Sequence, residues 1–474
     1  MSLDRKILTV INPTLPIEQM DMANTEDERI PLQSDTNKHK VAGALYPLIQ
    51  INRHQFDAQE VSSLVLDETG FTPTIRVVVE PTDGIFVSKH FPKDGDPLSL
   101  WIRSKQDEFK PIRTDFEITS VRALPSMSDT GDVQRFTIEG TLRIPGLYAD
   151  WCKCFGNRGS MDTLLEVAKE LKAGFATNET STNDTMKWIC PYDSYDKFIK
   201  DITASSYKDD DSFFTSFFDH YYNLNFINLN NQFSEEFEVE KALETLTFDD
   251  DYFKGKELNK LSMDLFLCNY RTLRGTGNYI QGYTLLNDAG QLVIDNGYRR
   301  FVQYYDSDSN EQPIDKYKSY FIEPLDTKDT NDRILLKGRT NEDFYKKFNK
   351  YKWMGVKYGL PDGNMHDNYM HAVVQNWQNQ QQIDKMKMRL YLGKCNFNLY
   401  RGQRVPVLII NNADAARQKS TLLPEQSTNE QLSYDKFLTG YYVISGMMYT
   451  WSSDNPLFQQ ELFLSRREWQ IPTP

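Results

Sequence analysis

The feature that most constrains the fold of this chain is a series of short β-favouring runs separated by turn signals. Between residues 47 and 144, runs such as Thr74–Val79 and Leu98–Ile102 are interrupted by the turns Pro81–Gly84 and Lys93–Asp96. The Asp-Gly pairs in these turns are strong signals, because glycine accepts a positive φ at little cost. About six short strands in roughly 100 residues predict a small antiparallel barrel or sandwich.

β-favouring runs recur at the C-terminal end of the chain. Four runs there are rich in alternating, β-branched and aromatic residues: Met388–Leu392, Gln403–Ile410, Tyr441–Tyr449 and Gln460–Arg466. A polar stretch, Asn411–Leu432, separates the second run from the third. Two β regions therefore flank a mixed middle. Because no residue-level repeat links them, the recurrence is weak support for a duplication.

The segment 150–235 has an α+β pattern. Ser160, Asp193 and Asp211 can each cap a helix whose apolar residues recur at helical spacing. The three apolar sets are Leu164, Ala168, Leu171 and Phe175; Tyr195, Phe198, Ile199 and Ile202; and Phe213, Phe214, Phe217, Phe218 and Tyr221. Asn223–Leu229 is expected to form a strand.

The segment 236–387 gives a mixed pattern. It predicts helices at 239–246, 343–351 and 367–386, and extended segments at 261–267 and 292–302.

The predicted fold class is α+β and β-rich, with two small antiparallel β-barrel domains, an inserted α/β region and peripheral helices. The expected divisions of the 474 residues are an N-terminal arm, 1–45; a first β-barrel domain, 46–150; an inserted α+β domain, 151–260; a mixed region that contributes strands to the second barrel and helices, 261–387; and a second β-barrel domain, 388–474. The arm is polar and lacks periodicity, so we expect it to order only against something else.

Composition excludes several classes of protein. The net charge of −13 does not favour a protein that binds a nucleic-acid backbone, which needs surplus Lys and Arg on one face. The sequence contains no apolar run of about 18 residues, so no membrane span is expected. The N-terminus does not resemble a signal peptide. The five scattered cysteines fit a reducing compartment better than a disulfide scaffold.

Residues that could carry metal or redox chemistry are sparse. His366 and His371 lie five apart, which is not the spacing that places two ligands on one helical face. Cys152 and Cys154 lack the two-residue spacer of a zinc knuckle or redox motif. The triplets Asp209–Asp211 and Asp249–Asp251 lack the ligand pattern of a calcium loop.

Two further patterns also have plain structural readings. Gly275–Gly282 resembles a phosphate loop only loosely and reads as a turn. The aromatic run Phe213–Tyr222 could stack on bases, but it lacks interleaved Lys and Arg, so a buried helix face is preferred. We therefore expect no catalytic, cofactor-binding or metal-binding residues and no cofactor. The residues alone indicate an interaction or structural protein.

Three C-terminal stretches resemble a known family. They are Tyr391–Val407 (YLGKCNFNLYRGQRVPV), Gly440–Tyr449 (GYYVISGMMY) and Glu461–Arg466 (ELFLSR). Together they resemble the closing barrel of the central baseplate hub protein of contractile-tailed bacteriophages, a family related to late-control protein D and to the N-terminal region of VgrG. Pro73–Val79 and Lys93–Asp96 resemble its first barrel. A histidine usual in that family after the Gly-x-Tyr-x-Val strand is replaced here by Met447, Met448 and Tyr449.

The resemblance implies a structural protein rather than an enzyme. It implies a homotrimeric ring that adapts the sixfold tail tube to the threefold central spike and surrounds a channel through which DNA passes without specific binding. The implied partners are the spike, the tail tube, the baseplate wedge proteins and the tape-measure protein. The implied location is the virion tail baseplate, after synthesis in the host cytoplasm.

Two alternatives stay open at this point. One is a tail-associated enzyme that degrades carbohydrate or cell wall, which would need two carboxylates about 5–10 Å apart in an aromatic cleft. The other is a peripheral baseplate protein of similar fold, which copy number per virion would distinguish from a hub.

Overall fold

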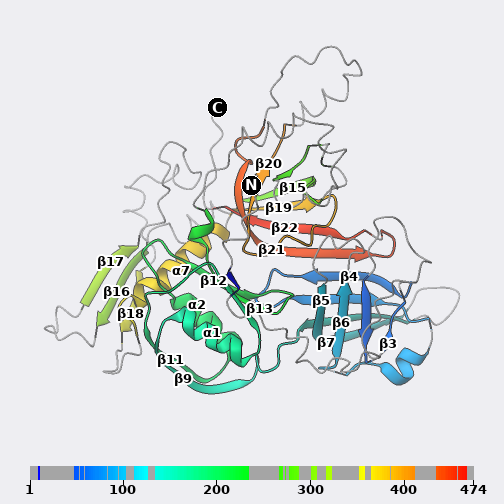
Figure 1. Cartoon of the computed structure of the whole chain (residues 1–474), viewed down its shortest axis with the longest axis horizontal. Coiled ribbons are helices and arrows are strands. Elements are labelled where there is room, and N and C mark those ends of the chain that lie inside the picture. Colours follow the sequence, from blue (N-terminus) through cyan, green and yellow to red (C-terminus); the bar gives the residue numbers. More distant parts are fainter. Residues whose placement is uncertain are drawn as a thin grey trace, which may run out of the picture.

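The protein is described by a computed structural model (Figure 1). The described residues are Thr9–Val10, 47–102 except 53, 58, 83 and 94, 112–125, 134–233, 266–270, 273, 277–287, 300–306, 317–322, 352–357, 365–411 except 385, and 434–466 except 456. The rest of the 1–45 arm, the helices expected at 239–246 and 343–351, and Asp249–Asp251 lie outside them.

The N-terminal β region is confirmed as a set of antiparallel strands. They are β2 (Leu48–Ile51), β3 (His54–Gln55), β4 (Val61–Asp67), β5 (Thr74–Val79), β6 (Pro97–Ile102), β7 (Ile112–Pro125) and β8 (Gln134–Leu142), with one short helix at Phe86–His90. Alternation sets the buried face, since Ile75, Val77 and Val79 of β5 are all buried. The predicted turn before β6 contains Gly95 at a φ of 84°.

The C-terminal runs are also strands, and they join the same sheet. They are β19 (Met386–Leu392), β20 (Arg404–Leu408), β21 (Gly440–Ser452) and β22 (Gln459–Ser465), with β14 (Leu267–Cys268) and β15 (Ile280–Asn287) added from the middle of the chain. The strand order is β15-β19-β22-β21-β4-β5-β8-β7-β6-β2-β3, and β20 links β21 to β14.

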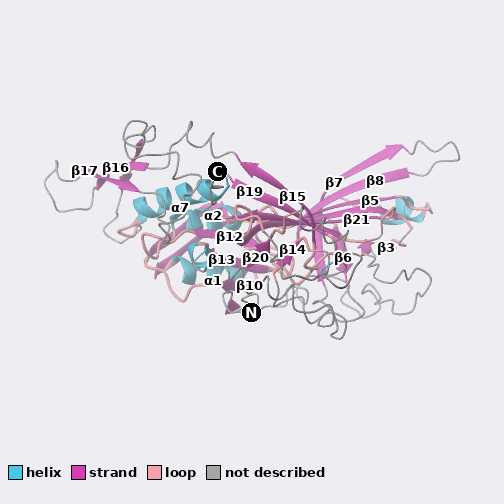
Figure 2. Ribbon diagram, turned by 90° about the horizontal axis from the view of Figure 1, so that it is seen from above, coloured by secondary structure: helices cyan, strands magenta, loops and turns pink. Residues whose placement is uncertain are grey.

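The two β regions meet at a single seam. β4 pairs antiparallel with β21, from Asp67 opposite Met448 to Ser63 opposite Ser452. One continuous apolar core therefore includes Leu64 of β4 and Trp451 of β21. The result is a curled sheet whose two halves splay apart, like part of a barrel (Figure 2).

The inserted α/β region packs beside this sheet. Its elements are β9 (Asp150–Arg158), α1 (Ser160–Glu170), β10 (Gly174–Thr177), β11 (Met186–Ser194), α2 (Tyr195–Ser205), β12 (Phe214–Phe218) and β13 (Asn223–Asn228). A four-stranded sheet has the order β1-β10-β13-β12, where β1 is Thr9–Val10, and β9 and β11 form a separate two-stranded ribbon. The strand expected at 223–229 is confirmed as β13.

The helix expected from Asp211 is wrong, because Phe214–Phe218 form strand β12. Phe214 and Phe218 pack in the core beneath α1 and α2, whereas Phe213 and Phe217 pack with Val443 of β21 in a second cluster. A strand that is buried on both faces shows no alternation, so its aromatic residues imitated helical spacing. Residues 214–218 form a strand because of tertiary burial, which a local sequence pattern cannot reveal.

The other two helices of this region are confirmed, with changed ends. Ser160 is the first residue of α1 rather than its cap, and Asp184 accepts a hydrogen bond from the Ser160 N–H at 2.9 Å. Ser194, not Asp193, caps α2 by accepting from the Lys197 N–H. Phe175, which was expected on the first helix, lies on β10.

A last helix, α7 (Tyr369–Asp384), comes from far along the chain and lies against α2 (Figure 1). It confirms most of the helix expected at 367–386. A small sheet of order β17-β16-β18 lies near α7, made of β16 (Arg300–Asp306), β17 (Tyr317–Ile322) and β18 (Lys352–Lys357). No helix among the described residues is long and apolar enough to cross a membrane.

Candidate assembly interface

The residues singled out for chemistry converge only in part. His371 Nε2 lies 3.6 Å from Asp210 Oδ1, so one histidine and one acidic triplet meet. Tyr207 donates to the same Asp210 oxygen at 2.7 Å, and burial lowers the pKa of His371 below its usual value. His366 faces elsewhere, within hydrogen-bond distance of the Ser205 carbonyl. In the described part of the chain, no three His, Cys, Asp or Glu side chains are placed to hold a metal ion.

The remaining sequence candidates lie in ordinary structural settings. Cys152 and Cys154 are exposed free thiols on β9. The described part of the glycine-rich segment leads into β15, and Gly277 packs closely against Asn396. A side chain at 277 would collide with Asn396, so packing accounts for this glycine.

A buried polar junction holds the large sheet to the α/β region. Glu68, just after β4, is hydrogen-bonded to His220 Nδ1, in the turn between β12 and β13, and both side chains are buried. Thr114 on β7 donates to the His220 carbonyl at 2.9 Å. The neighbouring Asp115 N–H donates to the Tyr222 hydroxyl at 2.7 Å. Because buried polar groups are costly unless paired, these bonds fix how the two parts meet.

Asp115 itself has an unusual protonation equilibrium. Burial raises the pKa of its carboxyl from 3.8 to about 7, although the charges of Arg113 and Arg143 oppose that shift. The carboxyl therefore titrates near neutral pH while it is fully enclosed.

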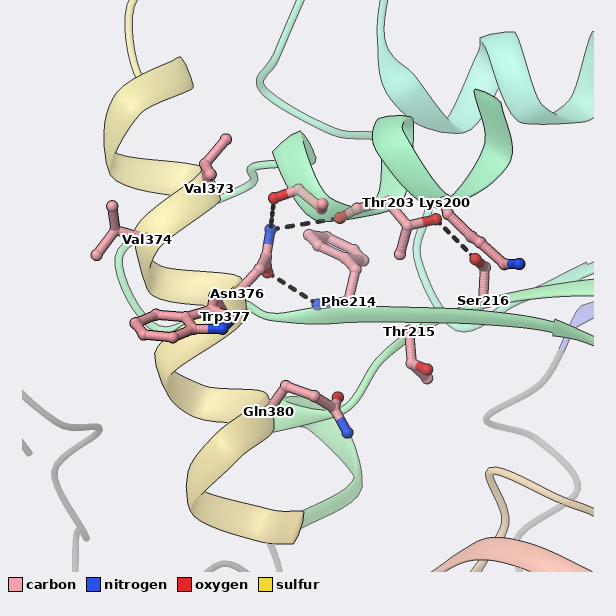
Figure 3. Close-up of a pocket in the computed structure, with 11 residues that line it drawn as sticks. Lys200, Thr203, Phe214, Thr215, Ser216, Val373, Val374, Asn376, Trp377 and Gln380 are labelled. Atoms are coloured by element: carbon pink, nitrogen blue, oxygen red, sulfur yellow. Dashed lines mark hydrogen bonds between the residues drawn. The ribbon is translucent and has the colours of Figure 1, made fainter. Parts of the chain in front are cut away.

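Amide side chains dock α7 onto the α/β region. Asn376 donates to the carbonyls of Ala204 and Ser206, at 3.0 and 2.9 Å, just where α2 ends. Helix ends leave such carbonyls without partners inside the helix, so this amide acts as a cap supplied from another element. The same side chain accepts from the Phe214 N–H on the outer edge of β12 (Figure 3).

An apolar groove of about 560 Å³ opens between α2, α7 and β12. Its walls include Thr203 and Ala204 of α2, Val373 and Trp377 of α7, and Thr215 and Ser216 of β12 (Figure 3). Among the described residues that line it, Lys200 is the one that carries a charge. Sequence reasoning missed this site, although one signal was present: Tyr369–Ile383 contains no Asp, Glu, Lys or Arg.

The second exposed apolar feature is the edge of the large sheet. β15 pairs with β19 on one side, and no described strand pairs with the other side. Its eight residues carry no charge, and Tyr283 and Leu286 are exposed, as is Tyr391 on β19. Natural proteins protect open edges with charge, proline or a cover. An uncharged open edge is typical of a surface that is covered in an assembly.

Solved structures with a similar fold include phage tail proteins and a type VI secretion component. A tail protein of 43 kDa from prophage MuSo2 of Shewanella oneidensis matches at a TM-score of 0.50 and 7% identity, covering 90% of this chain and 99% of that one. A tail protein of Neisseria meningitidis MC58 matches at 0.46 and 10% identity, covering 89% and 97%. The E. coli c3393 protein, a type VI secretion component, matches at 0.39 and 8%, covering 87% and 76%. No family model and no curated relative matches the sequence.

The MuSo2 match spans nearly the whole of both chains, so the chain has the fold of a phage tail protein. The expected resemblance is confirmed at the level of the fold. The same fold can serve different functions, so the role of this chain depends on its surfaces.

Proposed function

We propose that this chain is the structural hub of a contractile phage tail baseplate. Three copies would form a ring that adapts the sixfold tail tube to the threefold central spike and surrounds a channel for DNA. The observation that carries the proposal is the likeness to the MuSo2 tail protein over 90% of this chain. The spike, tube, wedge and tape-measure proteins are the proposed partners, and the virion tail is the proposed location.

The open edge of β15 supports assembly through strands. An uncharged edge that pairs with no other described strand can add a strand from another chain, and its exposed aromatic and aliphatic side chains would be buried by that addition. We propose that 46–150 and 388–474 are the two β-barrel domains that form the ring, that 151–260 is an inserted α+β domain, and that 261–387 contributes strands to the second barrel and helices.

The net charge of −13 is compatible with DNA passage, since a channel of like charge would not retain the DNA. A strongly basic channel lining in the assembled ring would contradict this part of the proposal.

The mass of the purified protein tests the oligomeric state. Light scattering should give three times the 55.3 kDa of one chain, either alone or with the spike protein. A monomer under both conditions would count against the hub. Copy number in the virion separates a hub, at three copies, from a peripheral protein, at six or more.

We further propose that the role is not enzymatic. Turnover of peptidoglycan or polysaccharide by the purified protein, abolished by substitution of one carboxylate, would overturn this.

A further inference from the structure

The groove between α2, α7 and β12 has the composition of a protein–protein contact. Protein interfaces are poor in charged residues at their centre and rich in Trp and Tyr. Charged residues make up 26% of this chain, yet Lys200 is the only charged one among the described residues that line the groove. Trp377 also lines it, with 43% of its surface exposed. The occupant should therefore be apolar and uncharged.

The edge of β12 limits the size of that occupant. The outward N–H of Phe214 is bonded to Asn376, and the outward N–H of Phe218 is bonded to the Phe71 carbonyl at 2.8 Å. Between them, the Ser216 N–H has no partner among the described residues. An extended segment can therefore form a backbone hydrogen bond with β12 only at Ser216, while one of its side chains enters the groove.

The chain itself contains an exposed, uncharged segment with a protruding aromatic side chain. Tyr192 on the β9–β11 ribbon is 76% exposed, more than any other large apolar residue in the described part of the chain. A register break between Pro191 and Asp193 and a φ of 57° at Tyr192 push this ring outward. Ile189 is also exposed, and Ile189–Tyr192 contains no charged residue.

Tyr192 cannot fill the groove of its own chain. It lies just before the start of α2, whereas the groove adjoins Thr203 and Ala204 at the end of that helix. Tyr195, the first residue of α2, and Ala204 are nine residues apart, which is about 14 Å along the helix axis at about 1.5 Å per residue and beyond the reach of a tyrosine side chain. The ribbon and α7 also contact α2 from different sides (Figure 1).

We propose that Tyr192 of one copy inserts into the groove of the next copy, beside Trp377. The contact joins two different surfaces, so it repeats in one direction and forms a ring when the rotation closes. Closure with three copies rests on the proposed trimer. Tyrosine and tryptophan are typical energetic centres of such contacts, so loss of either should weaken assembly at least tenfold.

The first test compares single substitutions in the full chain by light scattering across a dilution series. Tyr192→Asp and Trp377→Ala should raise the concentration needed for half-assembly at least tenfold. Leu457→Asp, at another large apolar residue that is 48% exposed, is the control and should leave this concentration unchanged. A trimer unaffected by Tyr192→Asp would overturn this inference and leave the hub intact, whereas a wild-type chain that stays monomeric both alone and with the spike protein would overturn both.

The second test does not depend on the stability of a variant. In a background with Cys152→Ser and Cys154→Ser, a Tyr192→Cys protein is mixed with a Thr215→Cys protein and oxidised. A disulfide-linked dimer should form in the mixture, and neither protein alone should give it. Trimers without this cross-link would overturn the proposed contact.

Discussion

The side-chain oxygen of Asn376 accepts a hydrogen bond from the backbone N–H of Phe214 at 3.1 Å, across 162 positions of sequence. One amide thereby joins α7 to β12, and through its NH₂ group it also closes the end of α2. The position of the groove depends on this residue, because all three walls meet at it.

Replacement of Asn376 by Ala should destabilise the protein by about 1–3 kcal/mol, because it leaves buried donors and acceptors unpaired. Asn376→Asp keeps the acceptor for Phe214 and loses the donors, so the two variants separate these contributions. Thr215→Ala, on the same groove, is the control and should change stability by no more than about 0.5 kcal/mol. Urea unfolding of the α/β region, followed by tryptophan fluorescence, provides the measurement.

Replacement of Asp115 by Asn should stabilise the protein at neutral and alkaline pH. The pKa of the folded carboxyl, about 7, lies above the ordinary 3.8, so the folded state binds the proton more tightly than the unfolded state. This carboxyl therefore reduces stability as pH rises from about 4 to 7. The gain in Asp115→Asn should be on the order of 1–4 kcal/mol at pH 8 and vanish near pH 4. Thermal midpoints of both proteins at several pH values test this, and a pH-independent difference would contradict it.

The Glu68–His220 pair should show strong coupling. Removing one member takes this hydrogen bond away from the other, which stays buried, and that costs about 1–3 kcal/mol. The double variant Glu68→Gln/His220→Gln should lose much less than the sum of the single variants. A double-mutant cycle measures this energy, and additive single effects would show that the contact contributes nothing.

Gly402→Ala should be strongly destabilising, by about 2 kcal/mol or more. Gly402 has a φ of 82°, and an added Cβ would overlap the Ile227 side chain of β13. Gly156→Ala on β9 is the matched control, because nothing lies within 4 Å of the position its Cβ would take. Comparison of thermal midpoints checks both, and similar midpoints for the two variants would refute the steric argument.

Strands such as Thr74–Val79 could be predicted because one of their faces is buried and the other is not. Glycine turns marked their ends. The β12 strand could not be predicted, because both of its faces are buried, by α2 on one side and by Val443 on the other. The ribbon of β9 and β11 has bulges and was missed for a related reason, since register breaks disrupt alternation.

The groove could not be predicted from the sequence either, for a different reason. Its walls come from α2, α7 and β12, and nothing in the order of residues shows that Trp377 will face Thr215. The uncharged run Tyr369–Ile383 indicates that a helix is covered, but it does not identify the covering element.

The seam between β4 and β21 has a consequence for synthesis of the protein. Ser63 and Ser452 pair across about 390 residues of chain, so β4 lacks its partner until translation is nearly finished. At ~5–20 residues per second, that wait lasts about 20–80 s. During this time the edge of β4 that will pair with β21 is open, and other nascent copies can compete for it. The yield of folded protein should therefore depend on how quickly the last strands leave the ribosome.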